Sequence, residues 1–229
     1  MKILVSDYDG TFNSFYFKKA FKKNRDSVND FRTAGNIFII ATARSPKHMY
    51  KEIEKWDIKC DYLICNNGNV VLDSNKNVLF SSVFDKEYVT QLIETTSYLY
   101  DLDFSQCIAP YGENPANAPF TINDQTLKLI NVKSAFYEFG LKVDTFLNNI
   151  KFSRFSNKRD GLIELLKKIR ISLNDPNIYS IGNSINDIEL LKTFNGFKVP
   201  WSNPYLLFRS DIPTIGSVHS LTKKIQEEK

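Results

Sequence analysis

Residues 2–11 read Lys-Ile-Leu-Val-Ser-Asp-Tyr-Asp-Gly-Thr, and these ten residues are the most informative about the fold. Its unbroken apolar run, Ile3 to Val5, predicts a short strand of a parallel sheet that helices cover on both faces. Two acids follow the strand directly, Asp7 and Asp9, and Gly10 then lets the backbone turn sharply. Ligands of parallel sheets bind outside the carboxyl ends of the strands, so we expect a site here.

The rest of the chain extends this frame. Continuous apolar runs predict further buried strands, and apolar residues at helical spacing between capping signals predict helices. The expected strands are residues 36–41, 61–65, 178–181 and 197–199, and the expected helices are 26–34, 45–56, 158–171, 185–194 and 217–228. This β-α alternation predicts an α/β fold, a parallel sheet between helices.

The middle of the chain does not continue the alternation of strands and helices. A hairpin is predicted from strands at 70–72 and 78–80, after which strand-rich, aromatic sequence interrupts the α/β pattern. We expect a helix at 85–100, strands at 102–109, 120–122 and 127–132, and a loop at 110–119. The predicted organisation is a core of residues 1–81 and 151–229, with a small α+β domain, residues 82–150, inserted after the third strand.

Composition limits the functions to consider. The 229 residues carry a formal charge of +4, which suits an anionic small substrate. The basic cluster at 18–25 fits a solvated helix face better than a nucleic-acid surface. Three cysteines without a CxxC pair fit a reducing cytoplasm. No signal peptide or membrane span is expected, because acids interrupt the apolar start and the longest apolar run is short. We expect a monomer or weak dimer.

Asp7 and Asp9 suit a division of labour in which one carboxylate is a nucleophile and the other a proton donor. The same residues also fit a plain turn. A calcium loop is excluded, because its third acid is missing and Lys18 stands where its final glutamate belongs.

Three other segments place polar residues at the same sheet edge. Thr42 ends the second strand, where its hydroxyl could hold a phosphate oxygen or cap the next helix. Lys158 opens the returning helix, where it could neutralise a carboxylate and a phosphoryl group, or lie on the surface. Asp187 follows the fourth core strand and offers a metal ligand or a helix N-terminal acid.

Together these motifs resemble the haloacid dehalogenase superfamily, and more narrowly its Cof-type and sugar-phosphate phosphatase branch with a large α/β cap. The resemblance rests on residues 7–11, 40–45, Lys158 and 181–187, with 65–68 as the entry to the cap and 199–204 as a late loop. It covers nearly the whole chain.

The resemblance implies a Mg²⁺-dependent phosphatase that forms a phosphoryl-aspartate on a small phosphorylated metabolite. Asp7 matches the nucleophile and Asp9 the general acid/base. Thr42 matches the phosphate-binding hydroxyl, and Lys158 the lysine that steadies Asp7 and the phosphoryl group. The implied phosphate or substrate contacts are Gly10, Thr42, Ala43, Arg44 and Asn203, and the implied metal ligands are Asp7, the carbonyl of Asp9, Asp187 and Asn183.

The sequence departs from that family in three respects. Asn183 stands where the family usually has aspartate, so we hypothesise weaker magnesium binding, with Asp187 as the main carboxylate there. Second, Ala43 replaces a usual glycine, and Lys158 lacks the glycine that usually follows it. Third, the chain is shorter than typical Cof-type members, so we expect a compact cap. Two other functions remain open, namely a phosphomutase with the same aspartyl chemistry and a silent relative that binds a phosphorylated ligand. Candidate cap contacts are Tyr111, Asn114, Asn117 and Lys128.

Overall fold

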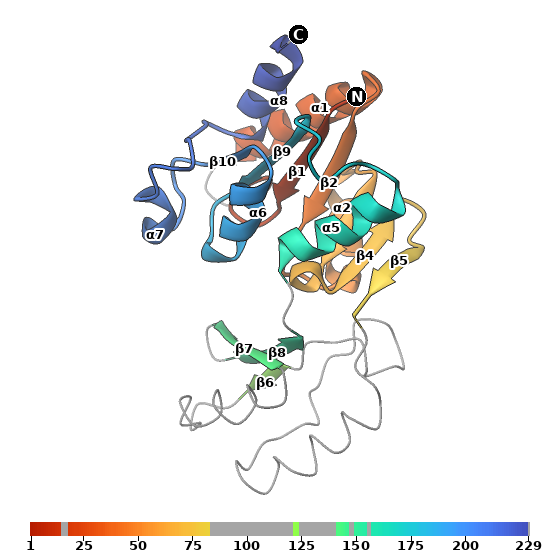
Figure 1. The fold of residues 1–229 in the computed structure, drawn as a ribbon, viewed down its shortest axis with the longest axis vertical. Helices are drawn as coiled ribbons and strands as arrows, with labels where there is room; N and C mark the ends of the chain where they lie inside the picture. The colour runs from red at the N-terminus through yellow and green to blue at the C-terminus, as the bar shows by residue number, and fades with distance from the viewer. Residues whose placement is uncertain (15–17, 83–120, 124–140, 147–148, 155–156, 229) are drawn as a thin grey trace, which may run out of the picture. The chain divides into compact units, whose positions relative to one another are not determined.

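The computed structural model describes residues 1–14, 18–82, 121–123, 141–146, 149–154 and 157–228 (Figure 1). The chain divides into two compact units. The first joins Met1–Phe80 to Asn157–Lys229, and the second is Ser81–Ser156. Candidate cap contacts Tyr111, Asn114, Asn117 and Lys128, and the elements predicted at 85–100, 102–109, 110–119 and 127–132, lie outside the described residues.

A seven-stranded, mostly parallel sheet forms the first unit, in the order β10-β9-β1-β2-β3-β4-β5. The first five strands in that order run parallel, and β3 pairs antiparallel with β4. The strands are β1 (Ile3–Asp7), β2 (Ile37–Ala41), β3 (Tyr62–Cys65), β4 (Val70–Asp73), β5 (Val78–Ser81), β9 (Ile178–Gly182) and β10 (Gly196–Lys198). The predicted α/β class is confirmed, and its first strand lies between β2 and β9.

Helices cover both faces of this sheet because its strands are apolar on both sides. The helices are α1 (Lys18–Thr33), α2 (Pro46–Trp56), α5 (Lys158–Lys168), α6 (Ile188–Thr193), α7 (Pro204–Leu207) and α8 (Val218–Glu227), with short 3₁₀ turns η1 (Asn66–Gly68) and η4 (Ile185–Asp187) (Figure 1). Helices α5 and α6 pack on the face that carries Ile3, Val5 and Ile39. On the opposite face, the Phe12 and Phe38 rings lie 5.4 Å apart.

The first helix begins eight residues before its predicted start at Asp26. Phe21, Val28 and Phe31 follow one another at helical spacing and are all buried, so the apolar face of α1 extends across Asp26. Asp26 is therefore an exposed residue inside the helix and not its cap. Lys19, Lys22 and Lys23 are exposed on α1, as expected for a solvated helix face.

The second unit contains a three-stranded antiparallel sheet in the order β6-β8-β7. Its strands are β6 (Thr121–Asn123), β7 (Leu141–Phe146) and β8 (Asn149–Arg154). The expected strand at 120–122 corresponds to β6, but β7 and β8 were not predicted. The predicted boundary at 150/151 cuts through β8, whose pairing with both neighbours keeps residues up to Ser156 in the second unit.

In the described part of the chain, no helix combines the length and apolarity needed to cross a bilayer.

Candidate active site

Asp7 is the last residue of β1, and a tight turn follows it. The Phe12 N–H donates to the Asp7 carbonyl (3.1 Å), and the Gly10 N–H donates to the Asn13 carbonyl (2.9 Å). Gly10 has a φ of 81°, and a Cβ built on it would lie 2.2 Å from the Asn183 side chain. Only glycine fits this turn without strain, which explains why the loop after β1 contains it.

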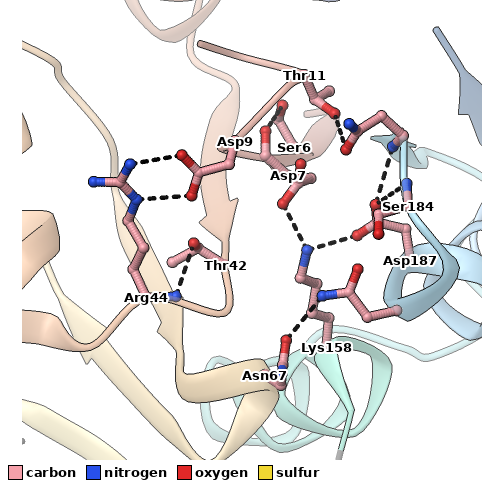
Figure 2. Close-up of polar contacts among 12 residues, drawn as sticks. Ser6, Asp7, Asp9, Thr11, Thr42, Arg44, Asn67, Lys158, Ser184 and Asp187 are labelled. Carbon is pink, nitrogen blue, oxygen red and sulfur yellow. Dashed lines mark hydrogen bonds and ion pairs between the residues drawn. The ribbon is translucent and has the colours of Figure 1, made fainter. Parts of the chain in front are cut away.

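Lys158 bridges two carboxylates at the centre of the site (Figure 2). Its Nζ lies 2.6 Å from Asp7 Oδ1 and 2.6 Å from Asp187 Oδ1. The three residues come from β1, α5 and η4, which lie far apart in the sequence. Each is almost fully buried, with 4 %, 1 % and 0 % exposure for Asp7, Lys158 and Asp187. The predicted Lys158 contact with Asp7 is present in the structure.

Burial controls the ionisation of this cluster. The pKa of Asp7 is raised to about 7, chiefly by desolvation and also by Asp187, while Lys158 lowers it. Desolvation alone would lower the pKa of Lys158, but Asp187 and Asp7 together raise it above its ordinary value. Lys158 is therefore a cation at neutral pH, and the buried Asp7 carboxyl keeps its proton to a higher pH than an exposed aspartate does.

The position of Lys158 follows from how α5 begins. Asn157 and Asp160 form a reciprocal capping box that fixes the first turn of the helix. Gly161 then lies so close to Gly68 of η1 that a Cβ on Gly161 would be 2.7 Å from the Gly68 Cα. This glycine contact lets α5 dock against the loop after β3 and carries Lys158 to the strand ends.

Both carboxylate oxygens of Asp187 accept hydrogen bonds. Its Oδ2 accepts hydrogen bonds from the N–H groups of Asn183 (3.0 Å) and Ser184 (2.9 Å), while Oδ1 accepts from Lys158. The carboxylate thus ties the loop after β9 to α5. Its predicted role as the main metal-binding acid stays a prediction, since the contacts present are those of a group that positions Lys158.

The Asn183 side chain reaches the loop after β1. One end of its amide lies 3.0 Å from Asp7 Oδ2, 3.1 Å from the Asp9 carbonyl oxygen and 3.2 Å from Thr11 Oγ1. In the described residues no three His, Cys, Asp or Glu side chains gather as a metal cluster. Oxygen atoms of Asp7, Asp9 and Thr11 thus surround this end of the amide.

Asp9 is held by Arg44 (Figure 2). The guanidinium donates two hydrogen bonds of 2.7 Å to the two carboxylate oxygens of Asp9. Glu52 lies 3.4 Å from Arg44 and also accepts a hydrogen bond from the Tyr8 hydroxyl (2.7 Å). Arg44 thus holds the predicted acid/base residue in place, and the Asp9 and Arg44 side chains keep about a third of their surface exposed.

The remaining predicted residues have varied positions. Thr42 is fully buried, and its Oγ1 accepts a hydrogen bond from the Arg44 N–H (3.1 Å). Ala43 lies between them and is partly exposed.

Asn203 is exposed, and its side chain caps α7 by accepting from the Tyr205 N–H. Its backbone N–H donates to the Asn183 carbonyl (2.7 Å). Phosphate or substrate binding by Gly10, Thr42, Ala43, Arg44 and Asn203 stays a prediction.

Sequence reasoning missed several supporting contacts. Glu52 is one, because only the turn of α2 brings it to Arg44. Trp201 is another, since its Nε1 donates to the Gly10 carbonyl (2.6 Å). Asn186 donates to the Asn67 side chain (3.0 Å) and links the loops after β9 and β3. Trp201 and Asn186 were in the segments singled out, but nothing in those segments gave their partners.

A family profile described as haloacid dehalogenase-like hydrolase matches residues 4–151, more than half of the chain. A hypothetical protein from Geobacillus kaustophilus has a similar fold, with a TM-score of 0.78 and 17 % identity over 98 % of each chain.

Two solved phosphatases are similar as well. BT1666 from Bacteroides thetaiotaomicron, a phosphatase of this superfamily, has a TM-score of 0.74 and 17 % identity, covering 99 % of this chain and 94 % of its own. The subclass IIB sugar phosphatase BT4131 has a TM-score of 0.71 and 14 % identity, covering 99 % and 98 %. At these identities the structures support the fold, while the family profile assigns membership. The chain belongs to the haloacid dehalogenase-like hydrolases.

Proposed function

We propose that this protein is a phosphatase that hydrolyses a small phosphate monoester through a phosphoryl group carried on Asp7. One observation carries the proposal, namely the convergence of Asp7, Lys158 and Asp187 at the carboxyl ends of β1 and β9. A buried cation beside a buried carboxylate offers charge neutralisation next to a nucleophile. Phosphoryl transfer asks mainly for positioning and for such neutralisation.

The reaction would proceed in two displacements. An Asp7 carboxylate oxygen attacks phosphorus, the ester P–O bond breaks, and the leaving oxygen takes a proton from the Asp9 carboxyl. Water then attacks phosphorus and gives a proton to the Asp9 carboxylate. The bond between phosphorus and Asp7 breaks, and inorganic phosphate leaves. Both oxygens of Asp9 accept hydrogen bonds from Arg44, so one of these bonds has to open before Asp9 carries the proton of the first step. The Asp9 side chain is 33 % exposed, so solvent reaches it.

The residues present fit magnesium. The ion prefers oxygen ligands and commonly takes only one or two protein carboxylates. Asp7 Oδ2, the Asp9 carbonyl and the Asn183 amide oxygen would hold it, with Thr11 close by. When bound, the ion would offset negative charge on a phosphoryl group. Because Asn183 is neutral, we propose that binding is weaker than with an aspartate in its place.

We propose a sugar phosphate or related metabolite as substrate. The similar structure BT4131 is a sugar phosphatase, and the second unit, Ser81–Ser156, is an insertion of the kind that could select substrates. We also propose a cytoplasmic location, in keeping with Cys60 and Cys65, which are free thiols.

A direct test is turnover of p-nitrophenyl phosphate and of a sugar-phosphate panel with magnesium. Native protein should release phosphate, and Asp7→Asn should release none, because an amide cannot act as the nucleophile. The exposed variant Asp26→Asn is a matched control for the same chemical change and should keep native rates. An Asp7→Asn protein with native rates would reject the proposal.

A further inference from the structure

Hydrogen bonds hold the backbone of Asn183 at both its N–H and its carbonyl group. Its N–H donates to Asp187 Oδ2 (3.0 Å), and its carbonyl accepts from the Asn203 N–H (2.7 Å). The backbone therefore has little freedom, and the remaining variable is the orientation of the amide. A half-turn of that amide exchanges a donor for an acceptor in nearly the same space.

The two orientations have opposite chemistry toward Asp7, Asp9 and Thr11. With nitrogen at the inner end, the amide donates toward Asp7 Oδ2, the Asp9 carbonyl and Thr11 Oγ1, at 3.0–3.2 Å. With oxygen there, only the Thr11 hydroxyl can supply a hydrogen, and the oxygens of Asp7 and Asp9 face a further acceptor. The first orientation is stable without a cation, and the second requires one.

The spacing of these oxygens suits that cation. Magnesium holds oxygen ligands octahedrally at about 2.0–2.1 Å, so neighbouring ligands lie about 2.8–3.0 Å apart. The inner end of the amide lies 3.0 Å from Asp7 Oδ2 and 3.1 Å from the Asp9 carbonyl. The same atom positions thus serve as hydrogen-bond partners in one orientation and as adjacent metal ligands in the other.

We propose that Asn183 is a two-position residue whose amide nitrogen takes the place of the cation in the metal-free protein and whose oxygen binds the metal after a half-turn. Metal binding then competes with the hydrogen bonds of the nitrogen-inward state. This keeps Asp7 and Asp9 in place without metal and makes magnesium binding weak and readily reversible. The proposal rests on the magnesium site of the proposed function but not on the reaction.

The test compares native protein with Asn183→Asp and Asn183→Ala, using magnesium alone as the probe. Aspartate offers only oxygens, so it should repel Asp7 without metal and attract the ion. We expect Asn183→Asp to bind magnesium at least about tenfold more tightly by calorimetry. In chelator, its Tm should fall by about 5 °C, with a smaller fall for Asn183→Ala. Asn186→Asp is the matched control, because it adds the same charge on a side chain bonded to Asn67. It should change magnesium affinity less than threefold.

Two results would overturn the proposal. One is a metal-free Asn183→Asp protein as stable as native, which would show that the nitrogen makes no stabilising contact with the oxygens. The other is unchanged or absent magnesium binding in Asn183→Asp. Neither magnesium affinity nor Tm depends on turnover. A protein that hydrolyses no ester would therefore reject the proposed function, while both measurements on Asn183 could still be made.

Discussion

Arg44 and Asp9 form a two-pronged ion pair, with both guanidinium–carboxylate distances at 2.7 Å. Such a planar fork fixes a carboxylate in direction as well as in distance. The pair is backed by Glu52 and by the Tyr8 ring, whose centroid lies 5.2 Å from the Arg44 guanidinium carbon. Arg44 is thus a positioning residue for the proposed acid/base.

Loss of this fork should slow the reaction. Arg44→Met should lower kcat about 10- to 100-fold. Without Arg44 the Asp9 side chain is no longer held in one orientation, so part of the rate gain from general acid catalysis is lost. Arg44→Lys keeps the charge without the fork and should recover only part of the rate. Steady-state kinetics on one ester would measure both. An Arg44→Met enzyme with native kcat and a raised KM would instead assign Arg44 to substrate binding.

Removal of Lys158 should destabilise the fold. Lys158→Met leaves the carboxylates of Asp7 and Asp187 buried without their cation, a situation that typically costs about 3–5 kcal/mol. Urea unfolding at neutral pH would measure this loss. Adding Asp7→Asn and Asp187→Asn to the same protein should restore much of the stability, because the buried charges are gone. A triple variant no more stable than Lys158→Met would contradict this account.

The glycine contact beneath α5 gives a packing prediction. Gly161→Ala would place a Cβ 2.7 Å from the Gly68 Cα and 2.7 Å from Ile64 Cγ2, so α5 must shift. We expect a loss of about 1–3 kcal/mol, as for other overpacked cores, with a fall in kcat because Lys158 moves. Gly216→Ala is the control, since its nearest atom, Ser220 Oγ, would be 3.3 Å away. Equal unfolding midpoints for the two variants would disprove the role of the contact.

The raised pKa of Asp7 predicts a dependence of stability on pH. Between its ordinary value of 3.8 and about 7, the folded protein holds a proton on Asp7 that the unfolded chain releases. Stability should therefore fall as pH rises through that window, by at most about 1.4 kcal/mol per pH unit. Asp7→Asn cannot titrate, so its unfolding free energy in chelator should fall less between pH 5 and 8. Parallel curves for the two proteins would mean that the pKa of Asp7 is close to normal.

The sequence predicted the parallel sheet because its strands are continuous apolar runs. The contact between Lys158 and Asp7 was implied by the family resemblance, since spacing alone placed Lys158 at the start of a helix without naming its partner. It misplaced the start of α1, since the polar residues around Asp26 hid the longer apolar face that includes Phe21. Strands β7 and β8 were missed because their sequences lack the unbroken apolar runs of the core strands.

The finer contacts of the site could not be predicted from spacing alone. The side-chain partners of Arg44 and of Asn183 depend on how two loops lie after strands β2 and β9, and many loop conformations suit those short sequences. Asn203 illustrates the limit, since its side chain serves the short helix α7, which no periodic pattern revealed.

A phosphoryl group on Asp7 can be detected directly during turnover. Protein quenched in acid during turnover of a phosphate ester should carry one added phosphoryl group on the peptide that contains Asp7, by mass spectrometry. With p-nitrophenyl phosphate, whose leaving group needs little protonation, Asp9→Asn should accumulate more of it, because activation of water in the second step is impaired. A reacting enzyme whose Asp7 peptide never gains that mass, in either protein, would contradict the account.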